Sequence, residues 1–182
     1  MIKQKVIPAA RRIADFEEMI KYPFEYVVML PIHLAQLRFV KDLAQSHRKK
    51  LILHADLIQG MKSDEAGAQY LCQEIKPDGL ISTHAQVLEM AKKRGVMTIQ
   101  RIFLLDSHSL ETSLRVIRTV EPDYIELLPG VIPELITEVY EATKIPILAG
   151  GFLRTPTHVE QALQAGAIAI TTSNKELWKK RS

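Results

Sequence analysis

The sequence predicts an α/β fold, a compact (β/α)8 TIM-like barrel, because strand-like and helix-like segments alternate along the whole chain. Apolar, β-rich runs begin near residues 5, 26, 51, 79, 97, 123, 146 and 167, and segments with helical periodicity lie between them. Strict alternation favours a parallel sheet covered by helices, and eight units favour closure into a barrel. An open doubly wound sheet is the main alternative.

The eight predicted strands are short and almost uninterrupted in their apolar character. They read KVIPAA, YVVML, LILHAD, GLIST, MTIQRIF, YIELL, PILAG and AIAITT. Such runs are typical of strands that are buried on both faces.

The segments between the strands carry apolar residues three and four positions apart, as in amphipathic helices. One such stripe consists of Leu34, Leu37, Val40, Leu43 and Ala44. Asp15 and Ser63 predict helix starts, and Gly95 and Gly166 predict helix ends. Because 182 residues is short for this fold, we expect brief loops and one missing or reduced helix.

Composition indicates an ordinary soluble protein with one domain over residues 1–182. Hydrophobic residues make up 47% and charged residues 25% of the chain, and the net charge of +3 permits a polyanionic partner without requiring one. No apolar run reaches the ~18 residues of a membrane span, and the start MIKQKVIPAA lacks the apolar stretch of a signal peptide. The single cysteine, Cys72, excludes an internal disulfide and is expected to be a core thiol. We therefore expect a cytoplasmic protein without membrane association.

Polar residues within or just after the apolar strands are candidates for a ligand pocket, because barrel sites lie at the carboxyl ends of the strands. These residues are Arg11, His33, His54, Asp56, Ser82, His84, Arg101 and Glu126. The alternative is that strand ends are polar simply because they meet water. Glu126 is expected to pair with Arg101 on the neighbouring strand, since a buried charge needs a partner.

The ends of the last two strands predict a phosphate site. The seventh strand stops at Gly150 and Gly151, and the eighth stops near Thr172 and Ser173. Glycine lets a ligand approach the main chain, and loops after strands seven and eight commonly hold phosphate in this fold. A tight turn followed by an ordinary helix cap is the alternative interpretation.

Several chemistries find little support. No predicted strand ends on lysine, which argues against a Schiff-base aldolase. No nucleophile elbow, Walker loop or dinucleotide fingerprint is present. A metal site built from His33, His54, Asp56, His84 and Glu126 is a minor alternative, because no local ligand motif joins these residues. We expect no metal, cofactor or catalytic residue, but a barrel enzyme with a phosphate substrate (isomerase, aldolase or transferase) stays open.

Several long blocks, LILHADLIQGMKSDEAGAQYLCQEIKPDGLIST, TIQRIFLLDS, PDYIELLPGVIP, AGGFLRT and TTSNKELW, resemble the glycerol uptake operon antiterminator regulatory proteins. The similarity runs from IPAAR at 7–11 to KELW at 175–178. The resemblance implies a cytoplasmic bacterial regulator without turnover, which responds to the effector glycerol 3-phosphate. It also implies action on leader mRNA of glycerol-utilisation genes, which lets transcription pass a terminator.

Two positions depart from the pattern of this family. Pro31 stands where a small or acidic residue is frequent, and His84 stands where arginine is frequent. If that arginine assists anion binding, His84 replaces it only when protonated, so ligand affinity would depend on pH near neutrality.

An RNA partner requires a basic surface, and three clusters, HRKK at 47–50, AKKR at 91–94 and WKKR at 178–181, are the candidates. The candidate contacts are Arg48, Lys49, Lys50, Lys92, Lys93, Arg94, Lys179 and Lys180. The first two clusters precede strands and are expected opposite the ligand pocket. Cations are also favourable at helix C-termini without any partner. Trp178 is expected either to contact RNA or to pack the last helix onto the barrel, and a homo-oligomer is compatible with the sequence.

Overall fold

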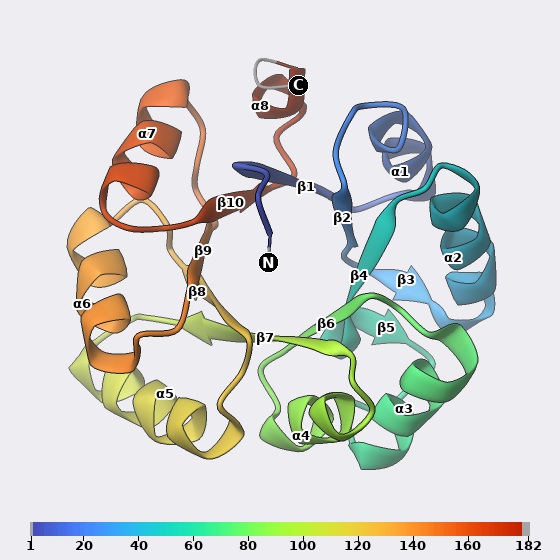
Figure 1. Ribbon diagram of the computed structural model, residues 1–182, viewed down its shortest axis with the longest axis horizontal. Helices are drawn as coiled ribbons and strands as arrows, with labels where there is room; N and C mark the ends of the chain where they lie inside the picture. Colours follow the sequence, from blue (N-terminus) through green and yellow to red (C-terminus); the bar gives the residue numbers. More distant parts are fainter. Residues whose placement is uncertain (1, 180–182) are drawn as a thin grey trace.

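In the computed structural model, which describes residues 2–179 without the Lys179 side chain, eight parallel strands close into a barrel inside a ring of helices (Figure 1). The barrel strands are β1 (Val6–Ala10), β2 (Tyr26–Met29), β4 (Lys50–His54), β6 (Gly79–Ser82), β7 (Met97–Phe103), β8 (Tyr124–Leu128), β9 (Ile147–Gly150) and β10 (Ala169–Thr172). Their order around the barrel is β1-β10-β9-β8-β7-β6-β4-β2. The predicted barrel is confirmed, and the open sheet is excluded.

The helices follow the predicted alternation. They are α1 (Ile13–Met19), α2 (Leu37–Ser46), α3 (Glu65–Tyr70), α4 (Ala85–Lys93), α5 (Ser107–Val120), α6 (Pro133–Thr143), α7 (Pro156–Gln164) and α8 (Lys175–Lys179), and α3 continues into the π-helical turn η3 (Leu71–Ile75). The last helix, α8, has five described residues. Within residues 2–179, no helix is long and apolar enough to cross a membrane.

The loops after β2 and β4 hold a small sheet outside the barrel. Here β3 (Ile32–His33) pairs in parallel with β5 (Ile58–Gln59), and the short 3-10 helices η1 (Leu34–Gln36) and η2 (Ala55–Leu57) flank it. The second barrel strand therefore ends at Met29, and His33 belongs to this small sheet instead of the rim of the barrel. Leu30 N still donates to Ala10 O at 2.9 Å, but Pro31 has no N–H with which to extend the ladder.

Two apolar clusters form the core, one inside the barrel and one between the strands and the helices. The inner cluster includes Ile52 and Ile99, and the N-terminal residue Ile2 closes it at the amino ends of the strands. Ile2 N donates to the hydroxyl of Tyr124, the first residue of β8, at 3.1 Å. In Figure 1 the N-terminus lies over the centre of the barrel. A ligand can therefore enter at the carboxyl ends.

The predicted helix starts are wrong in detail, whereas the predicted ends agree with the structure. Asp64, rather than Ser63, caps α3 by accepting from the main chain. Asp15 is buried inside α1 and lies 2.7 Å from Lys175 Nζ, so its carboxylate ties α1 to α8 instead of capping a helix. Gly95 and Gly166 follow α4 and α7 with φ values of 71° and 107°, which glycine adopts without strain.

Candidate ligand pocket

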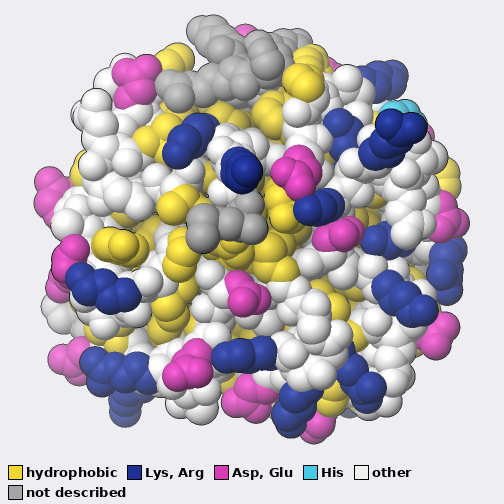
Figure 2. Space-filling view, viewed as in Figure 1, with side chains coloured by type: hydrophobic (Ala, Val, Ile, Leu, Met, Phe, Trp, Pro, Cys, Tyr) yellow, Lys and Arg dark blue, Asp and Glu magenta, His cyan; other side chains and the backbone are white. Residues whose placement is uncertain are grey.

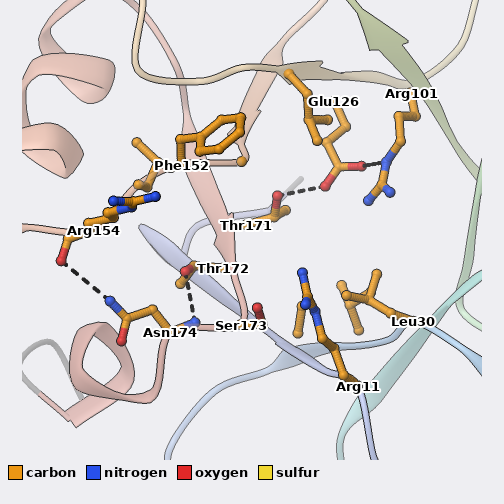
Figure 3. Close-up of a pocket in the computed structure, with 15 residues that line it drawn as sticks. Arg11, Leu30, Arg101, Glu126, Phe152, Arg154, Thr171, Thr172, Ser173 and Asn174 are labelled. Atoms are coloured by element: carbon orange, nitrogen blue, oxygen red, sulfur yellow. Dashed lines mark hydrogen bonds and ion pairs between the residues drawn. The ribbon is translucent and has the colours of Figure 1, made fainter.

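A cavity of about 400 Å³ opens at the carboxyl ends of the strands, between the β1 and β2 loops and the β9 and β10 loops (Figure 3). Its polar lining consists of Arg11, Arg101, Glu126, Gly151, Arg154, Thr171, Thr172, Ser173 and Asn174. Its apolar lining consists of Ala9, Val28, Leu30, Leu128, Phe152 and Leu153. Convergent polar groups beside apolar side chains are typical of small-molecule sites.

The charges around this cavity favour an anion. Three arginines, Arg11, Arg101 and Arg154, and one carboxylate, Glu126, line it, so its net charge is +2. The arginines come from three different parts of the chain, after β1, within β7 and after β9. Figure 3 shows Arg11 and Arg154 on opposite sides of the opening. An anion bound between them would meet positive charge from both sides.

Arg101, Glu126 and Thr171 form a buried network at the inner end of the cavity. Arg101 Nε donates to Glu126 Oε2 at 2.6 Å, and the Thr171 hydroxyl donates to Glu126 Oε1 at 2.6 Å. The Glu126 side chain is 2% exposed and that of Arg101 is 12% exposed. The predicted Arg101–Glu126 pair is confirmed. Because both oxygens of Glu126 accept hydrogen bonds, this carboxylate holds the strands together and is not a free base.

Gly150 and Gly151 differ in what they do. A Cβ on Gly150 would lie 2.6 Å from Thr171 Oγ1, so this glycine makes room for the buried network below the cavity surface and does not line the cavity. Gly151 lines the cavity and has a φ of 75°. The next residue, Phe152, also has a positive φ, 58°, and its side chain is exposed at the rim. Such strained backbone is found preferentially at functional sites.

The chain after β10 is fastened to the loop after β9. Asn174 N donates to Thr172 Oγ1 at 3.1 Å, and Asn174 Nδ2 donates to Arg154 O at 3.3 Å (Figure 3). Trp178 Nε1 donates to Thr172 O at 2.9 Å, and the indole is 1% exposed, so Trp178 packs α8 onto the barrel. Ser173 stays exposed and faces the cavity.

Five of the polar residues predicted to line the pocket lie elsewhere: His33, His54, Asp56, Ser82 and His84. His33 belongs to β3, where its Nδ1 accepts from Ala35 N. Asp56 accepts hydrogen bonds from the Ser82 hydroxyl and from Thr83 N, so these side chains satisfy one another. Although burial raises it, these hydrogen bonds hold the pKa of Asp56 below its usual value.

His54 and His84 are absent from the pocket lining for two different reasons, burial and exposure. His54 is 2% exposed, and its Nδ1 has no hydrogen-bond partner among the described residues. Burial, with the nearby charge of Arg101, lowers the pKa of His54 to about 4. His84 is exposed at the start of α4 and does not line the cavity.

Arg154, Phe152 and Asn174 also line the pocket, although they are not among the residues predicted from the sequence. Each follows a residue that was singled out at the end of β9 or β10, and GGFLRT contains two of them. An arginine four residues after Gly150 was the available signal. Among residues 2–179, no three His, Cys, Asp or Glu side chains are grouped closely enough to hold a metal ion. Cys72 is buried, as expected, and burial raises the pKa of its thiol.

The first two basic clusters, at 47–50 and 91–94, lie at the opposite end of the barrel, as predicted, but three of their lysines make structural contacts. Lys49 Nζ donates to Tyr22 O at 2.6 Å and Phe24 O at 2.8 Å. Lys92 Nζ donates to two carbonyls at the end of α5, and Lys50 pairs with Glu25 at 2.7 Å.

Figure 2 shows this face, with Lys and Arg side chains interspersed among Asp and Glu. Arg48, Lys93 and Arg94 are exposed there. The Lys179 side chain and Lys180 lie outside the described residues.

Comparison with known proteins identifies the family of this chain. The model of the family described as glycerol-3-phosphate responsive antiterminator matches residues 6–178. The chain belongs to this family. A glycerol uptake operon antiterminator regulatory protein from Listeria monocytogenes, solved by crystallography, is 44% identical, with 97% of this chain and 95% of that chain covered and a TM-score of 0.95.

Other relatives of this antiterminator-family protein are more distant. A glycerol uptake operon antiterminator-related protein from Thermotoga maritima is 24% identical, with 98% and 99% of the two chains covered and a TM-score of 0.86. The uncharacterized protein YgcP from Escherichia coli K12 is 29% identical over 173 residues, with 95% and 91% covered. The aldolase QR15 is 14% identical with a TM-score of 0.75, a likeness that shows the barrel fold alone.

Proposed function

We propose that the protein binds glycerol 3-phosphate in the cavity of Figure 3 and thereby regulates its own binding to leader mRNA of glycerol-utilisation genes. The observation that carries the proposal is the net charge of +2 around a cavity of about 400 Å³. A phosphate monoester carries about −1.5 to −2 charges at neutral pH, so the two charges are complementary. The family description supports the choice of glycerol 3-phosphate among phosphate esters.

The phosphate is proposed to lie against the loops after β9 and β10. Gly151 presents main chain without a Cβ, and Ser173 presents an exposed hydroxyl. Arg154 adds a guanidinium from the β9 loop, and guanidinium is well suited to phosphate. Thr172 supports this arrangement by accepting from Asn174 N. Gly150 is proposed to act indirectly, because its lack of a Cβ leaves space for the buried hydrogen-bond network beneath the cavity.

The glycerol end is proposed to point toward Arg101 and Glu126, which lie across the cavity from the phosphate loops (Figure 3). Guanidinium N–H groups can donate to ligand hydroxyls, and carboxylate oxygens can accept from them. Leu30 and Leu128 lie on the cavity wall and can contact the carbon chain. This division gives each part of the ligand a partner of matching polarity.

We further propose that the ligand leaves unchanged. Among the described residues no lysine lines the cavity, so the Schiff-base chemistry of barrel aldolases has no nucleophile among them. Glu126 already accepts hydrogen bonds from Arg101 and Thr171, which makes it a poor base. The test is incubation of pure protein with glycerol 3-phosphate. Sustained conversion that is lost in Glu126→Gln would favour the phosphate-substrate enzyme instead.

RNA binding is proposed to use exposed cations at the amino ends of the strands, above all Arg48, Lys93 and Arg94. Contacts of Lys and Arg with phosphates release counterions, so affinity should fall steeply with salt. Replacing Arg48, Lys93 and Arg94 together by alanine should flatten this dependence without changing affinity for glycerol 3-phosphate, because these exposed side chains do not line the cavity. Glycerol 3-phosphate should tighten RNA binding by about 1–3 kcal/mol, the usual range of coupling between sites.

Calorimetric titration tests the ligand site. Arg154→Ala should weaken glycerol 3-phosphate by about 1.5–3 kcal/mol, the value of a hydrogen bond to a charged group. Arg118→Ala is the matched control, because Arg118 is exposed at the end of α5 and does not line the cavity. Gly151→Asp should abolish binding by steric block and like-charge repulsion. Wild-type affinity in Gly151→Asp would place the ligand elsewhere.

A further inference from the structure

A second hollow, of about 350 Å³, lies on the outer side of β7, between this strand and α5. Gln100 and Phe103 of β7 line it, together with Thr83 after β6 and with His108, Thr112 and Ser113 of α5. The ligand pocket lies on the inner side of the same strand and takes none of these six side chains.

The buried carboxamide of Gln100 points to a ligand in this hollow. Gln100 is 2% exposed, and its Oε1 has no hydrogen-bond partner among the described residues. Buried polar side chains are normally paired, so an unpaired one needs an explanation. A leucine would occupy nearly the same space without the free-energy cost of burying an unpaired carbonyl oxygen. The position is therefore better suited to an added binding partner than to packing alone.

The remaining lining favours a flat, aromatic, polar-edged molecule. Phe103 is 49% exposed, which leaves its ring accessible beside the hollow. Hydroxyl groups and an imidazole from α5 add further donors and acceptors around the carboxamide. Unpaired RNA bases are recognised by this combination, with an aromatic ring that stacks on the base and polar groups that bond its edge.

We propose that this hollow binds one unpaired base of the RNA, a proposal that rests on the RNA partner assigned under the proposed function. The Gln100 carboxamide presents a donor and an acceptor side by side, the pattern with which glutamine pairs to adenine. Adenine is therefore the expected base. Phe103 stacks on its face and contributes affinity without distinguishing between bases.

The position of the hollow also gives the base site a route to the effector. Gln100 and Arg101 are consecutive in β7, and consecutive strand side chains point to opposite faces. Arg101 lines both cavities and is held by Glu126 in the inner one. A ligand that changes the position of Arg101 acts on the strand that carries Gln100. By linkage, the factor by which the effector changes the affinity of the hollow for RNA is also the factor by which RNA in the hollow changes the affinity for the effector.

Fluorescence anisotropy with labelled ten-residue oligonucleotides of adenosine, uridine or cytidine tests the base site, with and without saturating glycerol 3-phosphate. Phe103→Ala should weaken all three by about 5- to 150-fold, the range for loss of one stacked base. Gln100→Leu should weaken the adenosine oligonucleotide most and so reduce the preference for adenine. Phe39→Ala is the matched control, because Phe39 on α2 is also 49% exposed but does not line the hollow.

The outcomes separate this proposal from the proposed function. Circular dichroism and calorimetry should show native folding and unchanged effector affinity for Gln100→Leu and Phe103→Ala. If wild type binds RNA and both variants bind it equally well, the base site is wrong and the proposed function stands. If wild type binds none of the RNAs, both fall. If Phe103→Ala only lowers the mass of an oligomer, the hollow is a protein contact and the base site is overturned.

Discussion

Replacement of Glu126 by glutamine should test how strongly the buried network under the pocket stabilises the barrel. Glu126 Oε2 lies 2.6 Å from Arg101 Nε, and the side chains are 2% and 12% exposed. Removing one partner of a buried pair costs about 3–5 kcal/mol, because the other charge stays buried without compensation. Glutamine still accepts one hydrogen bond, and Arg101 keeps some contact with water. We therefore expect the lower end, about 3 kcal/mol.

Urea unfolding followed by circular dichroism measures this change. With an m value of about 2 kcal/mol/M, a loss of 3 kcal/mol lowers the midpoint by about 1.5 M. Glu25→Gln is the matched control, because Glu25 pairs with Lys50 at 2.7 Å while both side chains are about half exposed. Exposed pairs contribute little to stability, so its midpoint should hardly move. Similar midpoints in the two variants would refute the assignment of stability to burial of the Arg101–Glu126 pair.

Three further predictions concern single residues. Gly150→Ala should lower the free energy of unfolding by about 1–3 kcal/mol, because its Cβ would meet Thr171 Oγ1 at 2.6 Å; an unchanged melting temperature would contradict this. The pKa of His54 is lowered to about 4 from 6.5, so between these pH values the unfolded chain binds the proton more readily than the folded one. The free energy of unfolding should therefore fall by up to about 1.4 kcal/mol per pH unit as pH drops from 6.5 toward 4. An NMR titration in which the folded protein's imidazole titrates near pH 6.5 would exclude this. Hydrogen bonds from Arg12 and Lys175 lower the pKa of Asp15 to about 2 from 3.8, so the stability that they provide is present above pH 4 and lost toward pH 2. In this window the free energy of unfolding should depend less steeply on pH for Asp15→Asn than for the wild type. Equal slopes for the two proteins would contradict this role of Asp15.

The barrel could be predicted because the sequence patterns that produce its strands and helices are repeated along the chain. Each strand is an apolar run, such as LILH in β4, and each helix carries an apolar stripe, such as Leu37, Val40 and Ala44 in α2. These periodicities depend on neighbours in sequence, so they need no knowledge of tertiary contacts. The pairing of Arg101 with Glu126 was also accessible, because both lie inside apolar strands where an unpaired charge is costly.

Membership of the pocket could not be predicted to the same extent. Arg101 lies in β7 and His54 ends β4, yet only Arg101 lines the cavity, since the His54 side chain is almost completely buried. Asp56 and Ser82 bond each other instead of a ligand. Lys49 reads as a free cation in HRKK but donates to two carbonyls. For Asp56 and Lys49 the partner comes from a distant part of the chain.

The sequence alone therefore determined the order of strands and helices, the end of the barrel at which a site lies, and the glycine and hydroxyl residues beside the proposed phosphate. Only the tertiary structure decided which polar side chains are available to a ligand. Closure of the barrel brings Arg11 and Arg154 to one opening, and the packing of α5 beside β7 leaves a hollow next to Gln100. The physical reason is that periodicity sets the face of an element locally, whereas hydrogen bonds and burial between elements set the availability of each polar group.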